Sequence, residues 1–535
     1  MNKARTLVEI SRFYANNNDK VVALDRRGLG CFSKSLEHDD LGDPDPASYG
    51  TLLRALESGD PGDFQQIRFG SPQAVRLTHP QAGAAFERVP QELALPPAPR
   101  FDSEQTAHET GELYWMALAR DIPFRSYETN DLIAAAAASL DREFAAYGGP
   151  RPVTPRNIFR GIHPGERVGP YVSQLLLKGN VDPRKLDGRG RDANEGYISY
   201  GAQVIDQRII PPRQGLDFLT DFDAWLGVQN GEDTRGQDRF GTPGDDPSRR
   251  FLYNLRFGAT YVHFDQVLNA FYNAAWILMS EPAGNQLEHV LGATGRPLID
   301  PEFAPGSFGS THLLQVLGEA LRRALRAVWG QKWGVHRRMR PEEFGGRVHN
   351  QVRGTRRYPI HPSLPASLRS GGLAPFFGKP FARFPESYLL PQAYPEGAPA
   401  HPGYGSGHAA GAAACATILK AFFAESVAIE NPVEAAADGF TLQPYTGADA
   451  EQMTVGGEID KLAGNIARFR NAAGVSFRSD CAASFPLGER VAVRLLQEMS
   501  LGFGGEDVSF ELTRLDGRKI RISEGKVVPI ARKRS

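Results

Sequence analysis

Residues 401–423 read HPGYGSGHAAGAAACATILKAFF, a Pro/Gly-rich loop that runs directly into a helix of small residues. The junction at Ser406, Gly407 and His408 presents free backbone N–H groups and the positive end of the helix dipole to whatever lies before it. Ser406 adds a hydroxyl donor, and Gly407 lets the backbone approach closely. His408 can exchange protons with a bound anion, and the positive potential favours its neutral form. His401 can reach the same pocket from the loop. The alternative for both histidines is a capping or surface role.

A second stretch, residues 310–346, places a lysine on an apolar helical stripe. Ser310 or Thr311 is expected to cap the helix, and a further four-residue step after the stripe reaches Lys332. An unpaired ammonium on an inward face must reach water or meet an anion, because its burial costs several kcal/mol or more. Arg340 follows just before Pro341, where a helix is expected to end. The alternative is that both cations pair with structural carboxylates. The stripe consists of Leu314, Leu317, Leu321, Leu325 and Val328.

A third stretch, residues 456–496, repeats this pattern with an arginine. Ile459, Leu462, Ala463 and Ile466 form a stripe that reaches Arg470. The helix is expected to loosen at Ala473 and Gly474, after which Ser476 and Asp480 follow. Three inward cations and one helix N-terminus predict a cradle for a tetrahedral oxyanion with a charge of about −1 to −2.

The overall charge of the chain shows whether such an anion site can result from a general excess of basic residues. The 535 residues contain 61 Lys and Arg against 62 Asp and Glu, a net charge of −1. This balance argues against a nucleic-acid partner, so the positive charge must be concentrated locally. Cys31, Cys415 and Cys481 are widely spaced, which favours three thiols over disulfides or a zinc site. The sequence contains no uninterrupted run of about 18 apolar residues, so no transmembrane helix is expected. The N-terminus has no apolar leader, so a cytoplasmic location is expected by default.

The pattern along the chain predicts a mainly α-helical protein in three parts. Residues 1–105 are rich in turns with short helices, residues 106–505 form a helical domain that contains the three stretches, and residues 506–535 form a β-hairpin appendage with a tail. Within the helical part, helices are expected around 132–144, 216–228 and 262–279. Long loops are expected at 180–215 and 229–250.

The motifs KWGVHRRMRPEEFGG (332–346), HPGYGSGHA (401–409) and RNAAGVSFRSD (470–480) together resemble the algal and cyanobacterial branch of the vanadium-dependent haloperoxidases. The same motifs are shared with type 2 phosphatidic acid phosphatases. The resemblance covers most of the chain and extends to the stretches 33–50, 101–124, 158–174, 216–231 and 261–274. It implies an all-α fold built on two four-helix bundles, with a small C-terminal β-hairpin and assembly into dimers or larger homo-oligomers.

The resemblance also implies roles for the residues of the three stretches. Lys332, Arg340, Ser406, Gly407 and Arg470 would hold vanadate, for which phosphate can substitute. His408 would be the acid–base residue, Lys332 would also polarise the peroxide, and His401 would be the additional histidine of the pocket. The family's axial vanadium ligand, a histidine six residues after the second arginine, is Ser476 in this chain. Asp480 matches the aspartate that orients this histidine and is therefore expected to lack its usual partner.

The resemblance implies a vanadate-dependent haloperoxidase that oxidises bromide or iodide with hydrogen peroxide to a hypohalous-acid equivalent. Its partners would be hydrogen peroxide, a halide and a small organic acceptor, with no nucleic acid and no membrane. Because a neutral hydroxyl is a poor ligand, Ser476 is expected to weaken vanadate binding and impair activity. Two alternatives stay open: an anion-binding homologue with little or no activity, and an acid phosphatase, although a serine nucleophile needs a base that the sequence does not supply.

Overall fold

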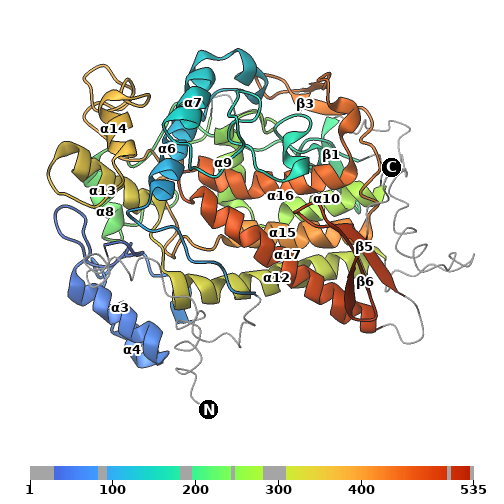
Figure 1. Cartoon of the computed structure of the whole chain (residues 1–535), viewed down its shortest axis with the longest axis horizontal. Helices are drawn as coiled ribbons and strands as arrows, with labels where there is room; N and C mark the ends of the chain where they lie inside the picture. The colour runs from blue at the N-terminus through green and yellow to red at the C-terminus, as the bar shows by residue number, and fades with distance from the viewer. Residues whose placement is uncertain are drawn as a thin grey trace, which may run out of the picture.

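Helix α15, Gly407–Phe422, lies at the centre of the largest group of helices. The helices α12 (Ser310–Gly330), α16 (Val455–Ala472) and α17 (Arg478–Leu501) all pack against it. In Figure 1 these four helices run side by side along the long axis of the molecule. Small residues permit the close approach: a Cβ added at Gly488 of α17 would lie 2.0 Å from the carbonyl oxygen of Ala410. The expected small-residue helix is therefore the buried core of a four-helix group.

The computed structural model describes residues 29–81, 93–180, 195–241, 247–280, 309–502 and 508–530. The expectation about the N-terminal leader, and parts of the loops expected at 180–215 and 229–250, lie outside these residues. The described residues are mainly helical, as predicted. The three cysteines are buried free thiols. Among the described helices, none is long and apolar enough to cross a membrane.

A second group of helices lies beside the first (Figure 1). Helix α6, Glu104–Ala119, packs against α7, Asp131–Arg142, and α14, Ser363–Ser370, and also touches α16. Helix α13, Pro341–Arg353, contacts α14 and α8, Phe222–Gln229. Short 3₁₀ helices connect the larger elements at Phe124–Thr129, Pro164–Arg167, Gln174–Leu176 and Ala450–Gln452.

Two of the expected helices have different bounds in the structure. The helix expected at 262–279 is divided into α9 (Leu255–Phe264) and α10 (Asn269–Ser280), because Asp265 is extended and Val267 has a φ of 56°. The helix expected at 216–228 begins only at Phe222, after Asp221, whose side chain accepts the N–H of Ala224. The division between α9 and α10 matters for function because it places Asp265 at the end of a helix.

The strands are few, but those at the C-terminus belong to the core. The expected hairpin is present as β5 (Ser509–Thr513) and β6 (Lys519–Ser523), and β7 (Lys526–Pro529) extends it to a three-stranded antiparallel sheet. The expectation of an appendage was wrong, because Phe510 and Ile522 are buried and the sheet packs on α15 and α17. Two further antiparallel pairs are β1 with β2 (Tyr197–Tyr200, Gln203–Asp206), in a segment expected to be loop, and β3 with β4 (Val433–Ala435, Leu442–Pro444).

The N-terminal part carries the short helices α3 (Pro46–Ser58) and α4 (Pro61–Gln65), as expected for a turn-rich segment. Asp45 and Asp60 cap them, and a proline begins each one. A small apolar cluster fixes this part to the helical body, because Phe32 packs edge-on against the buried ring of Trp333, 5.7 Å away. Trp333 directly follows Lys332, so the N-terminal part supports the turn that carries this cation.

Candidate anion-binding site

A cavity of about 410 Å³ lies where the three predicted stretches meet. Eight of the nine predicted site residues line it; the ninth, Asp480, is fully buried and is not part of the lining. The expected convergence on one cavity is thus present, while the binding roles of the residues stay predictions. The eight residues are Lys332, Arg340, His401, Ser406, Gly407, His408, Arg470 and Ser476.

Lys332 lies on a π-helical turn, Gln331–His336, that continues α12. Helix α12 itself begins after Gly309, so neither Ser310 nor Thr311 is the residue that caps it. Only 1% of Lys332 is exposed, and its Nζ donates to the carbonyl oxygens of Pro402 (2.6 Å) and Gly403 (3.2 Å). The lysine is therefore held against the loop that leads into α15. π-Helical turns are rare in proteins as a whole, but those that occur are often found at functional sites.

Arg340 marks the beginning of a helix rather than the predicted end of one. Pro341 is the first residue of α13, a position that suits its fixed φ and missing N–H. The carboxylate of Glu343 accepts the backbone N–H of Arg340 at 2.8 Å. The guanidinium donates to the carbonyl oxygens of His401 and Val475, both at 2.8 Å. Arg340 thereby ties the loop before α15 to the turn after α16.

Arg470 lies in the last turn of α16, as the apolar stripe predicted. Its Nη1 donates to the carbonyl oxygen of Val262 at 3.0 Å and reaches the Tyr394 hydroxyl at 3.5 Å. After α16, Gly474 turns the chain with a φ of 86°. This turn brings Ser476 back to the cavity that Arg470 lines.

The three cations have no carboxylate within ion-pair distance in the described part of the chain. Burial and the neighbouring Arg340 lower the pKa of Lys332 well below its usual range. Burial and Arg470 lower the pKa of Arg340 to about 10. Uncompensated buried charges cost several kcal/mol each, and an anion in the cavity removes this cost. The alternative of structural carboxylate partners is therefore contradicted for both Lys332 and Arg340.

His408 lies in the first turn of α15, at the predicted junction of loop and helix, and Ser406 is the N-cap. The Ser406 Oγ accepts the N–H of Ala409, so the hydroxyl serves the helix as well as the cavity. His408 Nε2 lies 2.9 Å from Asp265 Oδ1. Burial lowers the pKa of His408, and the nearby arginines lower it further, although Asp265 raises it. His408 is thus held in its neutral form and oriented by a buried carboxylate, which excludes a surface role.

His401 contacts the predicted site residue Arg340 and the ring of Trp329, which also lines the cavity. Its Nδ1 lies 2.9 Å from Arg340 Nη2, and its ring packs against Trp329 with 4.8 Å between centroids. Burial, Lys332 and Arg340 lower its pKa well below the usual range. A neutral His401 therefore accepts a hydrogen bond from Arg340 and adds no charge to the cluster.

Ser476 is 3% exposed, and its Oγ lies 3.4 Å from Arg340 Nη1. This is the only hydrogen bond of its hydroxyl to the described residues, so no base stands beside it. Asp480, which was expected to lack its usual partner, is fully buried and paired. One oxygen accepts from Arg338 Nη1 and the other from the N–H of Phe477, both at 2.8 Å. Arg338 thus compensates the negative charge of Asp480, the carboxylate that the resemblance implies for orienting an axial histidine.

Several residues of the site were not predicted. Asp265 was missed because the continuous helix expected at 262–279 hid its position at the end of α9. His263 stacks on Tyr394 with 3.8 Å between centroids, and its Nε2 lies 2.7 Å from Glu396 Oε1. The stretch YVHFDQ (261–266) is part of the resemblance to the family, which is a signal for both residues, but a resemblance over a whole stretch assigns no role to a single side chain.

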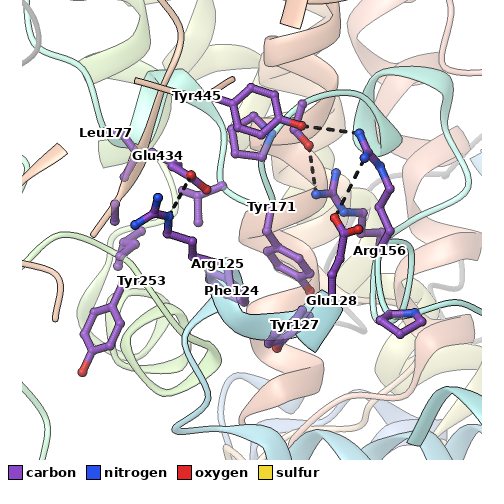
Figure 2. Close-up of a pocket in the computed structure, with 17 residues that line it drawn as sticks. Phe124, Arg125, Tyr127, Glu128, Arg156, Tyr171, Leu177, Tyr253, Glu434 and Tyr445 are labelled. Carbon is purple, nitrogen blue, oxygen red and sulfur yellow. Dashed lines mark hydrogen bonds and ion pairs between the residues drawn. The ribbon is translucent and has the colours of Figure 1, made fainter. Parts of the chain in front are cut away.

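A second cavity, of about 100 Å³, lies between the 3₁₀ helix Phe124–Thr129 and the β3–β4 pair (Figure 2). Two of its arginines are paired. Arg125 Nε lies 3.1 Å from Glu434 Oε1, and Arg156 Nη2 lies 2.8 Å from Oδ1 of Asp449, which is outside the lining. Aromatic rings fill one side, where Phe124 stacks on Tyr171. Its charges are largely neutralised in place, so the cavity around Lys332 is the better candidate for an anion.

Comparison with known proteins identifies the family of the chain. Residues 386–504 match the family model described as the VCPO second helical-bundle domain. The chain is 33% identical to a vanadium-dependent bromoperoxidase of Corallina pilulifera, over 92% of this chain and 91% of the relative. It is 32% identical to that of Ascophyllum nodosum, over 92% and 86%. The chain belongs to the vanadium-dependent haloperoxidase family. This haloperoxidase-family chain also superposes on the homohexameric second vanadate-dependent bromoperoxidase of Ascophyllum nodosum with a TM-score of 0.82. That alignment has 25% identity and covers 96% of this chain and 88% of the other.

Proposed function

We propose that this haloperoxidase-family protein binds vanadate in the cavity around Lys332 and oxidises bromide or iodide with hydrogen peroxide. One observation carries the proposal: Lys332, Arg340 and Arg470 are buried around one cavity at the N-terminus of α15, and none of them has a carboxylate partner among the residues that the structure describes. The named relatives are vanadium-dependent bromoperoxidases, which supports bromide as one substrate. Because the structural relative is homohexameric, we also propose that the protein forms a homo-oligomer.

The residues of the cavity fit a tetrahedral oxyanion. Arg470 uses only Nη1 for hydrogen bonds to the described residues, so its other donors remain available to an anion. Lys332, Arg340, the Ser406 hydroxyl and the N–H groups at the start of α15 would hold the remaining oxygens. Bound vanadate supplies a Lewis-acid centre that activates hydrogen peroxide towards halide without a change in oxidation state.

His408 is suited to take a proton from a reactant in the cavity. In the neutral ring whose Nε2–H donates to Asp265, Nδ1 carries the lone pair. Nδ1 makes no hydrogen bond to the described residues, so it is available to an incoming donor. Asp265 stabilises the imidazolium that forms.

Ser476 supports a second candidate, an anion-binding homologue with weak or no activity. Its hydroxyl meets Arg340 where the family has an imidazole ligand, so vanadate would be held by charge-assisted hydrogen bonds alone. The phosphatase alternative is less favourable, because a serine nucleophile needs a base and the hydroxyl contacts only a cation among the described residues.

Two parallel assays distinguish these functions. Purified protein is incubated with vanadate, peroxide and bromide and a halogen acceptor, and separately with p-nitrophenyl phosphate. Vanadate-dependent bromination without phosphatase activity is the expected result. Phosphate ester hydrolysis without bromination would favour the phosphatase. Binding of vanadate with neither activity would identify the inactive homologue.

A further inference from the structure

A third cavity, of about 600 Å³, adjoins the anion site across the end of α9. Val262 and His263 line the anion cavity, whereas Tyr261 and Phe264 line the third cavity. Asp265 lines both. Its Oδ1 meets His408, and its Oδ2 is buried without a hydrogen-bond partner in the described part of the chain. One carboxylate therefore separates the proton-transferring histidine from a second, larger space.

The wall of this third cavity is apolar and open to solvent. Phe264 is 56% exposed, Phe240 is 43% exposed, and their ring centroids lie 5.9 Å apart. Ile210 and Tyr200 extend the same surface and are 50% and 42% exposed. A contiguous group of exposed large apolar side chains is unusual on a protein surface and marks a place where an apolar partner binds.

The lining also contains polar side chains, among them Asp206, Gln207, Arg208, Arg249, Asn269 and Asn273. Asn273 Nδ2 lies 3.5 Å from Gln207 Oε1, and Asn269 lies at the first turn of α10 nearby in sequence. Arg208 is paired with Asp206 at 2.8 Å and so contributes little free charge. Carboxamides beside an aromatic wall suit a neutral molecule with an apolar body and one hydrogen-bonding group.

We infer that the third cavity binds the organic acceptor of the halogenation, and that the acceptor is an apolar, electron-rich arene such as an alkylated phenol. The inference rests on the proposed function, because the anion cavity must supply hypohalous acid past Asp265. The step is electrophilic substitution: an aryl C–H bond breaks and a C–Br bond forms. The ring proton combines with the hydroxide of hypobromous acid to give water, so that one arene and one HOBr give one bromoarene and one water. Carbon is oxidised and bromine is reduced from +1 to −1.

The size and continuity of the cavity favour this occupant. A volume of about 600 Å³ is in the range of small-molecule sites, and the shared Asp265 connects it to the reactive centre. Each CH₂ of an acceptor that is buried against Phe264 and Phe240 should lower KM about fourfold. A longer alkyl chain should therefore bind more tightly without changing the reactivity of the ring.

The experiment compares 4-methylphenol with 4-butylphenol, which share the reactive ring, using vanadate-loaded protein with peroxide and bromide. The variant is Phe264→Ala, which alters an exposed side chain, and the control is Phe381→Ala, which removes a fully exposed ring outside the cavity. We expect KM for 4-butylphenol to be about 60-fold lower than for 4-methylphenol in wild type and in Phe381→Ala, because the butyl chain adds three CH₂ groups. In Phe264→Ala this ratio should fall several-fold, while vanadate-dependent iodide oxidation stays unchanged.

Three results would overturn the inference: equal KM values in wild type, a ratio that Phe264→Ala leaves intact, or loss of iodide oxidation together with phenol bromination. Light scattering that shows a smaller assembly for Phe264→Ala would also overturn it, because the surface would then be a subunit interface. If the wild type halogenates nothing, the proposed function fails, but calorimetric binding of 4-butylphenol still tests the cavity. Binding that Phe264→Ala weakens supports the inference, and no binding contradicts it.

Discussion

Ser476 has a hydroxyl where the resemblance implies an imidazole, but its position in the chain still lies at the cavity. It is buried, lines the anion cavity and touches Arg340, so the position still faces the cavity where the anion is proposed to bind. The carboxylate of Asp480, four residues later, is paired with Arg338. Substitution of one side chain therefore tests the role of this position without a new buried charge.

We expect Ser476→His to bind vanadate about tenfold more tightly or better, because an imidazole can coordinate the metal and one tenfold step corresponds to about 1.4 kcal/mol. Bromination activity should rise with affinity. Ser476→Asn is the control, since it adds volume and hydrogen bonds but no comparable ligand nitrogen. Titration with vanadate measures both variants. Equal affinity of wild type and Ser476→His would show that this position does not face the metal.

We expect His408→Ala to lower turnover about 10²- to 10⁴-fold, the usual contribution of a positioned general base. Vanadate affinity should change much less, because the lysine and arginines supply most of the binding. In the parent, kcat/KM for peroxide should fall as the pH is lowered through the pKa of His408, which lies below its ordinary value of 6.5 because burial disfavours the charged form. The same activity and pH profile in parent and variant would mark His408 as structural.

The elements around the site explain which parts of it were predictable. Stripe periodicity predicted α16 and the position of Arg470, and the Ser-Gly-His junction predicted the N-terminus of α15, because both signals are local. Periodicity could not show that α12 continues as a π-turn at Gln331–His336 or that α9 ends at Phe264, since packing between distant segments determines these changes. Pro341 was assigned to the wrong helix end because a proline can precede a helix as well as end one.

The turn at Gly474 gives the clearest prediction about an element. A Cβ there would lie 2.8 Å from Gln392 Nε2, and the φ of 86° already disfavours a side chain. Gly354, which ends α13 with a φ of 79° and has no neighbour within 4 Å of such a Cβ, is the matched control. Gly354→Ala should cost about 1 kcal/mol of unfolding free energy, and Gly474→Ala should cost more. Only Gly474→Ala should weaken vanadate binding, because Val475 O and Ser476 meet Arg340; equal effects of the two variants would contradict this account.

The whole molecule is nearly neutral, yet its interior concentrates charge in separate places. Arg338 with Asp480 and Arg478 with Glu112 are paired inside the protein, whereas Lys332, Arg340 and Arg470 have no such partner in the described part of the chain. The net charge of −1 therefore gave no indication of the local field. Buried histidines add a pH dependence: His336 is fully buried, and burial lowers its pKa to about 3.

We expect acid to destabilise the protein partly through His336. Between its ordinary pKa of 6.5 and about 3, the unfolded chain takes up a proton that the folded protein does not, so stability falls as the pH is lowered. The slope approaches about 1.4 kcal/mol per pH unit. Urea unfolding at pH 7.5 and pH 5 should show that His336→Phe loses about 2 kcal/mol less than wild type between the two. Equal losses would indicate that His336 titrates normally in the folded protein.

The proposal that the unpaired cations hold an oxyanion is tested most directly by equilibrium dialysis against vanadate. Wild type should bind about one vanadate per chain, in competition with phosphate. Arg470→Leu should bind about 10- to 100-fold more weakly, the range expected for one lost charge-assisted contact. Arg353→Leu, which removes an exposed arginine at the end of α13, should bind like wild type. Absence of saturable vanadate binding by the wild type, or the same affinity in Arg470→Leu, would contradict the account.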